Sequence, residues 1–202
     1  MKNILFINTA LSKKCVALKT ESQVFFKDTT GYKKDLENTL SAIDQLCTQA
    51  GLSLNDLEQI VCVAGPGNFS AIRVGFIIAK TLSSQIENCE LLAIDSLSVL
   101  EFVNSENGKS AMNASKSEIY SLSDSQIILS QFNQSVLESD TVYDFDERFC
   151  QHNKINGIKL LSHTDLENFV KDSAFINFIK KHKQSNIEEP IYIKEPNIHV
   201  KD

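Results

Sequence analysis

The residues with the clearest potential for chemistry form a glycine-rich stretch, Gly65-Pro66-Gly67-Asn68-Phe69-Ser70-Ala71-Ile72-Arg73-Val74-Gly75. A turn of this kind between a strand and a helix can direct backbone N–H groups and the positive end of a helix dipole at an anion. Four residues are therefore candidates for an anion or nucleotide loop: Gly65, Gly67, Asn68 and Ser70. The alternative is structural, with glycines that only supply unusual backbone angles and close packing. Turn chemistry alone favours the structural alternative.

The other residues whose types could act in catalysis or ligand binding do not form a recognisable site. Asn107-Gly108-Lys109-Ser110 ends like a phosphate-binding loop, but Val103 stands where that motif requires its first glycine. No serine lies in a G-x-S-x-G elbow. The four histidines lie far apart without a helical ligand spacing: His152, His163, His182 and His199. The sequence therefore predicts no catalytic residue, no metal site and no cofactor.

The composition is that of a soluble globular protein. The chain has 202 residues, of which 42% are hydrophobic and 23% charged. No segment approaches the ~18 consecutive apolar residues of a membrane span, and the apolar run at 4–7 is too short for a signal peptide. We expect a cytoplasmic protein without membrane contact.

The charge distribution and the cysteines exclude several classes of binding and cross-linking. The formal net charge is −6, and the Lys and Arg residues are scattered, which gives little electrostatic support for direct binding to a nucleic-acid backbone. The five cysteines are odd in number and contain no C-x-x-C pair. They predict reduced, mostly buried thiols rather than disulfides or a zinc site.

The first half of the chain reads as alternating strands and helices. Strands are predicted at 4–7, 14–20, 23–28, 60–64 and 91–94, because these short runs are apolar or β-branched and end at polar residues or glycine. Apolar residues at spacings of three and four predict a helix over 34–50, which Gly51 ends. A second helix is predicted over 69–85, and Ser96 is the expected N-cap of a third that ends near Val103.

The second helix is apolar around most of its circumference, so more than one of its sides must be covered. It lies either in a large core or partly in an interface with another chain. The residues concerned are Ala71, Ile72, Val74, Phe76, Ile77, Ile78, Ala79 and Leu82.

The second half of the chain is less regular. Short strands are predicted at 110–114, 117–122, 126–130 and 157–161, with one helix at 172–183. We interpret residues 1–103 as an N-terminal α/β domain that carries the partner interface. Residues 104–202 form a smaller, divergent subdomain whose final segment returns to the first domain.

Residues 65–75 resemble the G-P-G-S-F-T-G-x-R-x-G signature of the TsaB (YeaZ) family and its glycoprotease-like paralogue TsaD, within the actin-like ATPase superfold. Other segments match in the same order. Residues 4–10 resemble the family's opening I-L-A-I-D-T-S, residues 50–57 its A-G-x-x-x-x-D-L linker, and residues 190–194 its closing P-x-Y-L-R. Between 104 and 188 the resemblance is faint.

The resemblance implies an α/β protein with the actin-like ATPase (ribonuclease H-like) fold, in which helices flank a mixed sheet and the second subdomain is reduced. TsaB is a scaffold for TsaD, which transfers threonylcarbamoyl to the tRNA adenosine next to the anticodon, with TsaE as an ATPase partner. We therefore expect a non-catalytic subunit that binds a TsaD-type protein directly. It would meet a TsaE-type ATPase through the complex and tRNA only indirectly.

In the family, the first two helices of the N-terminal domain form the subunit interface, and here these are 34–50 and 69–85. The candidate interface residues that the resemblance implies are Leu36, Leu40, Ile43, Cys47, Ile72, Phe76, Ile77 and Lys80.

The chain departs from the family pattern at several positions, and the last of these departures favours the partner over the transferase. Asn8 replaces the usual Asp, at a position where actin-like ATPases hold a hydrated metal with a carboxylate. Asn68 and Ala71 replace a Ser and a Gly. The entry to the first helix, residues 32–37, reads Y-K-K-D-L-E and lacks the histidine pair with which TsaD binds its metal.

Two alternatives remain open at this point. One is a small nucleotide-binding phosphotransferase or hydrolase of the same superfold that uses the loop at 65–70. The other is a homodimer with a regulatory task, in which the same helix faces pair with themselves.

Overall fold

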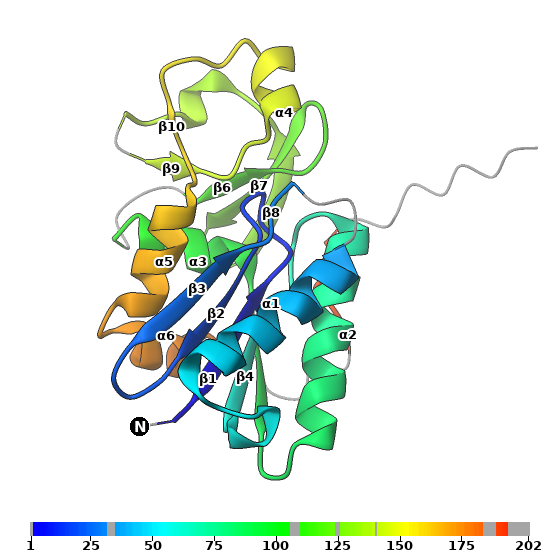
Figure 1. Cartoon of the computed structure of the whole chain (residues 1–202). Coiled ribbons are helices and arrows are strands. Elements are labelled where there is room, and N and C mark those ends of the chain that lie inside the picture. Colours follow the sequence, from blue (N-terminus) through cyan, green and yellow to red (C-terminus); the bar gives the residue numbers. More distant parts are fainter. Residues whose placement is uncertain are drawn as a thin grey trace, which may run out of the picture.

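The computed structural model describes residues 2–31, 35–105, 110–123, 126–139, 141–183 and 189–193. Its centre is a five-stranded sheet with helices on both faces (Figure 1). The strands are β1 (Ile4–Asn8), β2 (Cys15–Lys19), β3 (Val24–Asp28), β4 (Gln59–Val63) and β5 (Glu90–Ile94), in the spatial order β3-β2-β1-β4-β5. β1 pairs antiparallel with β2 and parallel with β4, so the sheet is mixed.

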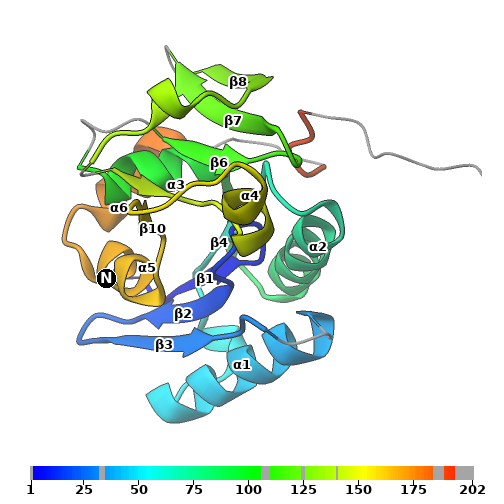
Figure 2. The ribbon, with the colours of Figure 1, turned by 90° about the horizontal axis from the view of Figure 1, so that it is seen from above.

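The central strands are apolar throughout because both faces of the sheet are covered. Alternate residues of β1 enter different clusters: Leu5 and Ile7 pack on one face, and Ile4 and Phe6 on the other. The helices α1 (Asp35–Ala50) and α2 (Phe69–Gln85) lie side by side on the Leu5 face, as Figures 1 and 2 both show.

The opposite face is covered by α3 (Ser96–Val103), α5 (His163–Lys171) and α6 (Phe175–His182). Phe169 is at the centre of this layer. Its ring lies 5.7 Å from that of Phe6, 5.1 Å from Phe175 and 5.2 Å from Phe178, in edge-to-face geometry. Such pairs add to the energy of apolar burial, so α5 and α6 are anchored on the first sheet.

A second lobe lies at the carboxyl end of β1 (Figure 1). It contains the antiparallel strands β6 (Ala111–Asn113), β7 (Glu118–Ser123) and β8 (Gln126–Gln131), the parallel pair β9 (Val142–Tyr143) and β10 (Lys159–Leu160), and α4 (Glu147–His152). Its own small core includes Tyr143, Phe145 and Phe149. Two short 3₁₀ turns, η1 (Leu54–Asp56) and η2 (Gln134–Val136), complete the described elements.

The mixed α/β architecture with flanking helices is confirmed, and all five strands of the first sheet lie where the sequence predicts them. The first residue of the predicted helix over 34–50 lies outside the described residues. One N-cap prediction was wrong. Asp95, and not Ser96, caps α3, because its carboxylate accepts from the Ser98 amide at 2.8 Å, while the Ser96 hydroxyl donates to the Pro66 carbonyl.

The second half differs more from its prediction. The helix predicted at 172–183 begins only at Phe175, because Asp172 ends the preceding helix α5. Neither α4, α5 nor β9 was predicted, and the strand expected at 157–161 is reduced to the two residues of β10. The division of the chain at residue 103 stays a prediction.

Candidate partner interface and glycine-rich loop

The glycine-rich loop connects β4 to α2 and is enclosed by three other segments. The Ile191 amide donates to the Ala64 carbonyl at 2.8 Å, and the Ser96 amide donates to the Gly65 carbonyl at the same distance. The Thr9 hydroxyl, in the turn after β1, donates to the Ala71 carbonyl at 2.7 Å. The loop is therefore a junction between β1, β5 and the closing segment at 189–193.

Each glycine of the signature lies where a side chain would collide with another segment. A Cβ at Gly65, whose φ is +114°, would approach the Ile191 carbonyl oxygen to 2.7 Å. A Cβ at Gly67 would meet the Ala10 backbone, and one at Gly75 the Thr9 side chain. Close packing thus accounts for all three glycines without a ligand.

The two remaining loop candidates, Asn68 and Ser70, are exposed. Asn68 is the N-cap of α2, and its side-chain oxygen accepts from the Ala71 amide at 3.1 Å. One of the first-turn N–H groups that an anion would use is therefore bonded within the protein. An anion role for Gly65, Gly67, Asn68 and Ser70 stays a prediction.

Gly75→Ala tests the packing role of the signature. We expect a loss of about 2 kcal/mol in the free energy of unfolding, because the new methyl displaces the Thr9 hydroxyl from its bond to the Ala71 carbonyl. Urea denaturation, monitored by circular dichroism, measures this loss in the free energy of unfolding. Gly51→Ala is a poor control because its φ is +68°, whereas Ser70→Ala, on the exposed first turn of α2, should leave stability within about 0.5 kcal/mol.

Asn8 organises the turn after β1. Its side-chain amide donates to the Lys13 carbonyl at 2.8 Å, and its oxygen accepts from the Leu11 amide at 3.2 Å. Asn8 is fully buried. An Asp in its place could not donate the first of these bonds, so the departure from the family's Asp has a structural explanation.

Asp144, from the second lobe, reaches the same turn. Both carboxylate oxygens lie 3.1 Å from the Ser12 amide nitrogen, and the side chain is buried. Burial raises the pKa of Asp144 to about 6, while hydrogen bonds from Ser12 and the charge of Lys13 act in the opposite direction. Sequence analysis missed this contact, although a carboxylate within the apolar run V-Y-D-F was a visible signal.

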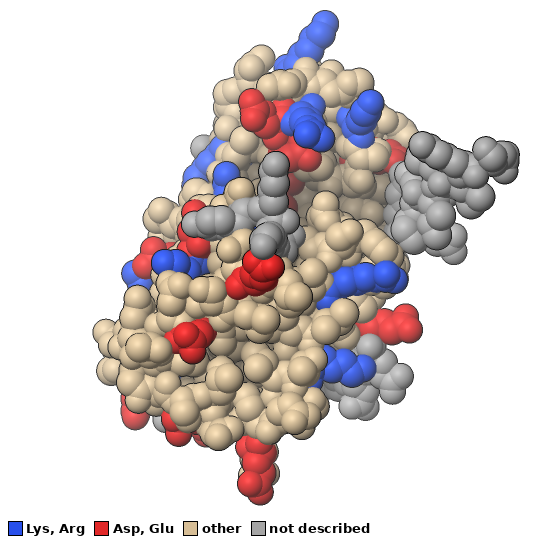
Figure 3. Space-filling view, turned by 45° about the vertical axis from the view of Figure 1, so that its right-hand side comes forward, with Lys and Arg blue, Asp and Glu red and all other residues tan. Residues whose placement is uncertain are grey.

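The α1–α2 face carries the largest exposed apolar side chains of the two helices. Leu36 is 49% exposed, Leu40 44% and Ile77 59%. Figure 3 turns this side of the molecule toward the reader, and uncharged surface predominates on it. We call Leu36, Leu40, Ile77 and the exposed Lys80 the α1–α2 face.

Four other predicted interface residues lie in the core and are removed from the surface set. Ile43 and Cys47 are 2% and 5% exposed, and they pack with Phe76, which is 3% exposed. Ile72 packs in the cluster on the other side of the sheet. The physical reason is that the apolar stripe of α1 is exposed only in its N-terminal half, since α2 and the sheet cover the rest.

The closing segment borders the α1–α2 face. Arg73 lies 4.2 Å above the Phe69 ring and donates from Nε to the Tyr192 hydroxyl at 2.9 Å. A cavity of about 380 Å³ opens between this group and Ile77, and Pro190 and Glu189 also line it. An exposed apolar residue beside a cavity is a common feature of protein interfaces.

Some predictions of the sequence concern residues that the structure does not describe. The segment 32–34 before the first helix, Gly108 and Lys109 of the G-K-S turn, and His199 lie outside the described residues. Within the described part of the chain, His, Cys, Asp and Glu side chains do not gather in a group of three that could hold a metal ion. In the same part, no helix is long and apolar enough to cross a membrane.

Comparisons with known proteins agree with this architecture. The family model described as TsaD, tRNA N6-adenosine threonylcarbamoyltransferase, matches residues 29–188. The chain is 31% identical over 98 residues to the tRNA threonylcarbamoyladenosine biosynthesis protein TsaB of Bacillus subtilis, an alignment that covers 48% of this chain and 42% of that protein. It is 25% identical over 122 residues to the protein of the same name from Haemophilus influenzae, an alignment that covers 58% of this chain and 51% of that protein.

The chain spans about half the length of the curated relatives it matches. The solved structure of YeaZ from Pseudomonas aeruginosa superposes with a TM-score of 0.65 at 16% identity, covering 96% of this chain and 100% of that chain. At this identity the likeness shows the fold alone.

The mixed sheet, the helices on both faces and the second small sheet define an α/β protein with the actin-like fold. Within that fold, the chain belongs to the family of the TsaD model, as a member of its TsaB (YeaZ) group.

Proposed function

We propose that this chain is the non-catalytic partner subunit that binds a TsaD-type protein for N6-threonylcarbamoylation of the tRNA adenosine next to the anticodon. The family assignment and the names of the curated relatives, which state tRNA threonylcarbamoyladenosine biosynthesis, support the pathway. The α1–α2 face is the observation that carries the partner role. Leu36, Leu40 and Ile77 expose apolar surface on the two helices that the family resemblance assigns to the interface.

A role without chemistry is supported by the way the signature residues are used. The glycines pack against the Thr9–Ala10 turn and the Ile191 carbonyl, and Asn8 supplies hydrogen bonds to its own turn rather than a carboxylate to a metal. These residues hold the fold together at the point where an enzyme of the superfold would need a charged group. In this proposal, the chain meets a TsaE-type ATPase through the complex and contacts tRNA only indirectly.

Size-exclusion chromatography with light scattering tests the partner role. The purified chain, mixed with the TsaD-type protein of the same organism, is expected to elute as a one-to-one complex. Elution of the two proteins as separate species across salt and nucleotide conditions would refute the proposal. A dimer of the chain alone that persists in the mixture would favour the homodimer alternative.

Reconstituted tRNA modification tests the absence of chemistry. Ser70→Ala removes the exposed hydroxyl of the glycine-rich loop, and we expect the rate of threonylcarbamoylation to stay within about twofold of the unsubstituted complex, since only interactions gained in the transition state change the rate. A loss of a hundredfold or more in this rate, with the complex intact, would mean that the chain takes part in catalysis.

A further inference from the structure

Lys19 is a nearly buried cation at the end of β2. The residue is 9% exposed, and its ammonium donates to the Val170 carbonyl at 2.8 Å, at the C-terminus of α5. It also lies 5.7 Å from the centre of the Phe175 ring. An ammonium has three N–H groups, and a single neutral carbonyl does not compensate the removal of its charge from water.

Among the residues that the structure describes, no carboxylate forms an ion pair with Lys19. Asp172 acts on it only through space, and desolvation by burial is the larger influence, so its pKa is lowered. The neighbouring Lys171 is already paired with Glu167 at 2.6 Å. The free N–H groups of Lys19 are therefore available to an anion that enters from outside.

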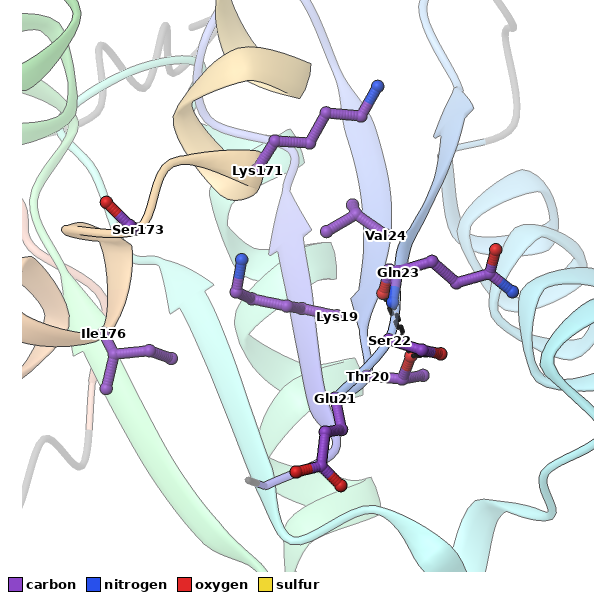
Figure 4. Close-up of a pocket in the computed structure, with 9 residues that line it drawn as sticks. All are labelled: Lys19, Thr20, Glu21, Ser22, Gln23, Val24, Lys171, Ser173 and Ile176. Carbon is purple, nitrogen blue, oxygen red and sulfur yellow. Dashed lines mark hydrogen bonds between the residues drawn. The ribbon is translucent and has the colours of Figure 1, made fainter.

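A cavity of about 520 Å³ adjoins the ammonium, between the β2–β3 hairpin and the α5–α6 turn. In Figure 4 the Lys19 side chain extends from β2 toward Ser173 of the α5–α6 turn and Ile176 of α6. Val24 and Ile176 add apolar wall, and the hydroxyl of the exposed Ser173 lies at the rim. The volume is in the range of small-molecule sites.

We propose that this cavity binds a small organic carboxylate, with the carboxylate on the Lys19 ammonium and an apolar body between Val24 and Ile176. A cation with unused donors selects the anion, and the apolar walls select an organic molecule over an inorganic oxyanion. Bound there, the ligand joins the first sheet to the helical layer of the chain's second half. The site lies apart from the α1–α2 face and does not depend on the proposed function.

An NMR titration of the ¹⁵N-labelled full chain tests the site with benzoate, its neutral isostere benzamide and inorganic phosphate. Benzoate is expected to shift the amide signals of residues 19–24 and 171–176 in a saturable way. Benzamide and phosphate should each bind at least about tenfold more weakly than benzoate. Benzamide lacks the charge, and phosphate lacks the apolar body. Equal binding of benzamide, tighter binding of phosphate, or shifts confined to other segments would overturn the proposal.

Matched lysine variants assign the effect. Lys19→Met should weaken benzoate binding about tenfold or more, whereas Lys27→Met, on the exposed part of the same sheet, should leave it unchanged. If Lys19→Met fails to fold, Ser173→Asp places a competing carboxylate at the rim of the cavity from an exposed position. Unaltered benzoate binding in that variant would equally refute the site.

Discussion

The double substitution Leu40→Glu, Ile77→Glu is expected to abolish a stable complex with a TsaD-type subunit while the chain stays folded. Both side chains are about half exposed on adjacent helices, so charge there costs the free protein little. Buried in an interface without a counter-charge, each carboxylate would cost about 2 kcal/mol or more, and together they would weaken binding by about a thousandfold. Isothermal titration calorimetry against the partner measures the loss.

Ile128→Glu is the matched control for this experiment. Ile128 is 44% exposed, the same fraction as Leu40, but it lies on β8 in the second lobe. The single variant is expected to bind the partner with unchanged affinity. If Ile128→Glu loses the partner and the double variant keeps it, the docking surface lies on the second lobe and the assignment to the α1–α2 face is wrong.

Helical periodicity located α1 and α2 but could not identify which apolar residues remain exposed. Leu40 and Ile43 lie on the same apolar stripe in the sequence, yet only Leu40 is at the surface. The difference depends on where α2 and the sheet cover α1, which is a property of helix packing. The four residues that proved to be buried are therefore indistinguishable from the exposed ones in the sequence alone.

The first sheet was predictable because its strands are strongly apolar and bounded by turn residues, as β1 and β4 show. In the second half, β6, β7 and β8 also lie where strands were predicted, but the chain beyond β8 lacked such signals. β9 and β10 contain two residues each, and their pairing joins positions that are distant in the chain. The helix α5 begins with the polar His163-Thr164-Asp165, and its apolar residues Leu166, Phe169 and Val170 find their partners on the first sheet. Tertiary contacts, rather than local propensity, determine these elements.

The glycine-rich stretch illustrates a limit of motif analysis. Its glycines predict either an anion site or close packing, and both need the same residue type. Only the positions of Thr9, Ala10 and Ile191, which come from other segments, show that a side chain would collide there. The packing explanation became evident once these segments were placed.

The burial of Asp144 should make stability depend on pH in a direction opposite to that of a stabilising carboxylate. Burial raises the folded-state pKa of Asp144 from the ordinary value of 3.8 to about 6. The native state thus holds the proton more tightly than the unfolded chain. The stability that protonation confers is fully present below pH 3.8 and is lost as pH rises toward 6.

Asp144→Asn is therefore expected to be more stable than the unsubstituted protein at pH 7.5, by up to about 3 kcal/mol, and equally stable near pH 3.5. An amide oxygen can still accept from the Ser12 amide, so the substitution removes the charge and keeps the acceptor. Urea denaturation at pH 3.5, 5, 6 and 7.5 measures the difference, which should grow between pH 4 and 6.

Asp146→Asn provides the control, because Asp146 is exposed and caps α4, a role that Asn performs equally well. Its effect on stability should be much smaller than that of Asp144→Asn. Because the charge of Asp146 helps to raise the pKa of Asp144, this variant should also move the pH dependence toward slightly lower pH without abolishing it. A constant difference between Asp144→Asn and the unsubstituted protein across the range would mean that Asp144 does not titrate there. Lower stability of Asp144→Asn at pH 7.5 would mean that the bond from Ser12 and the charge of Lys13 outweigh the cost of burial, and that the carboxylate holds the two lobes together.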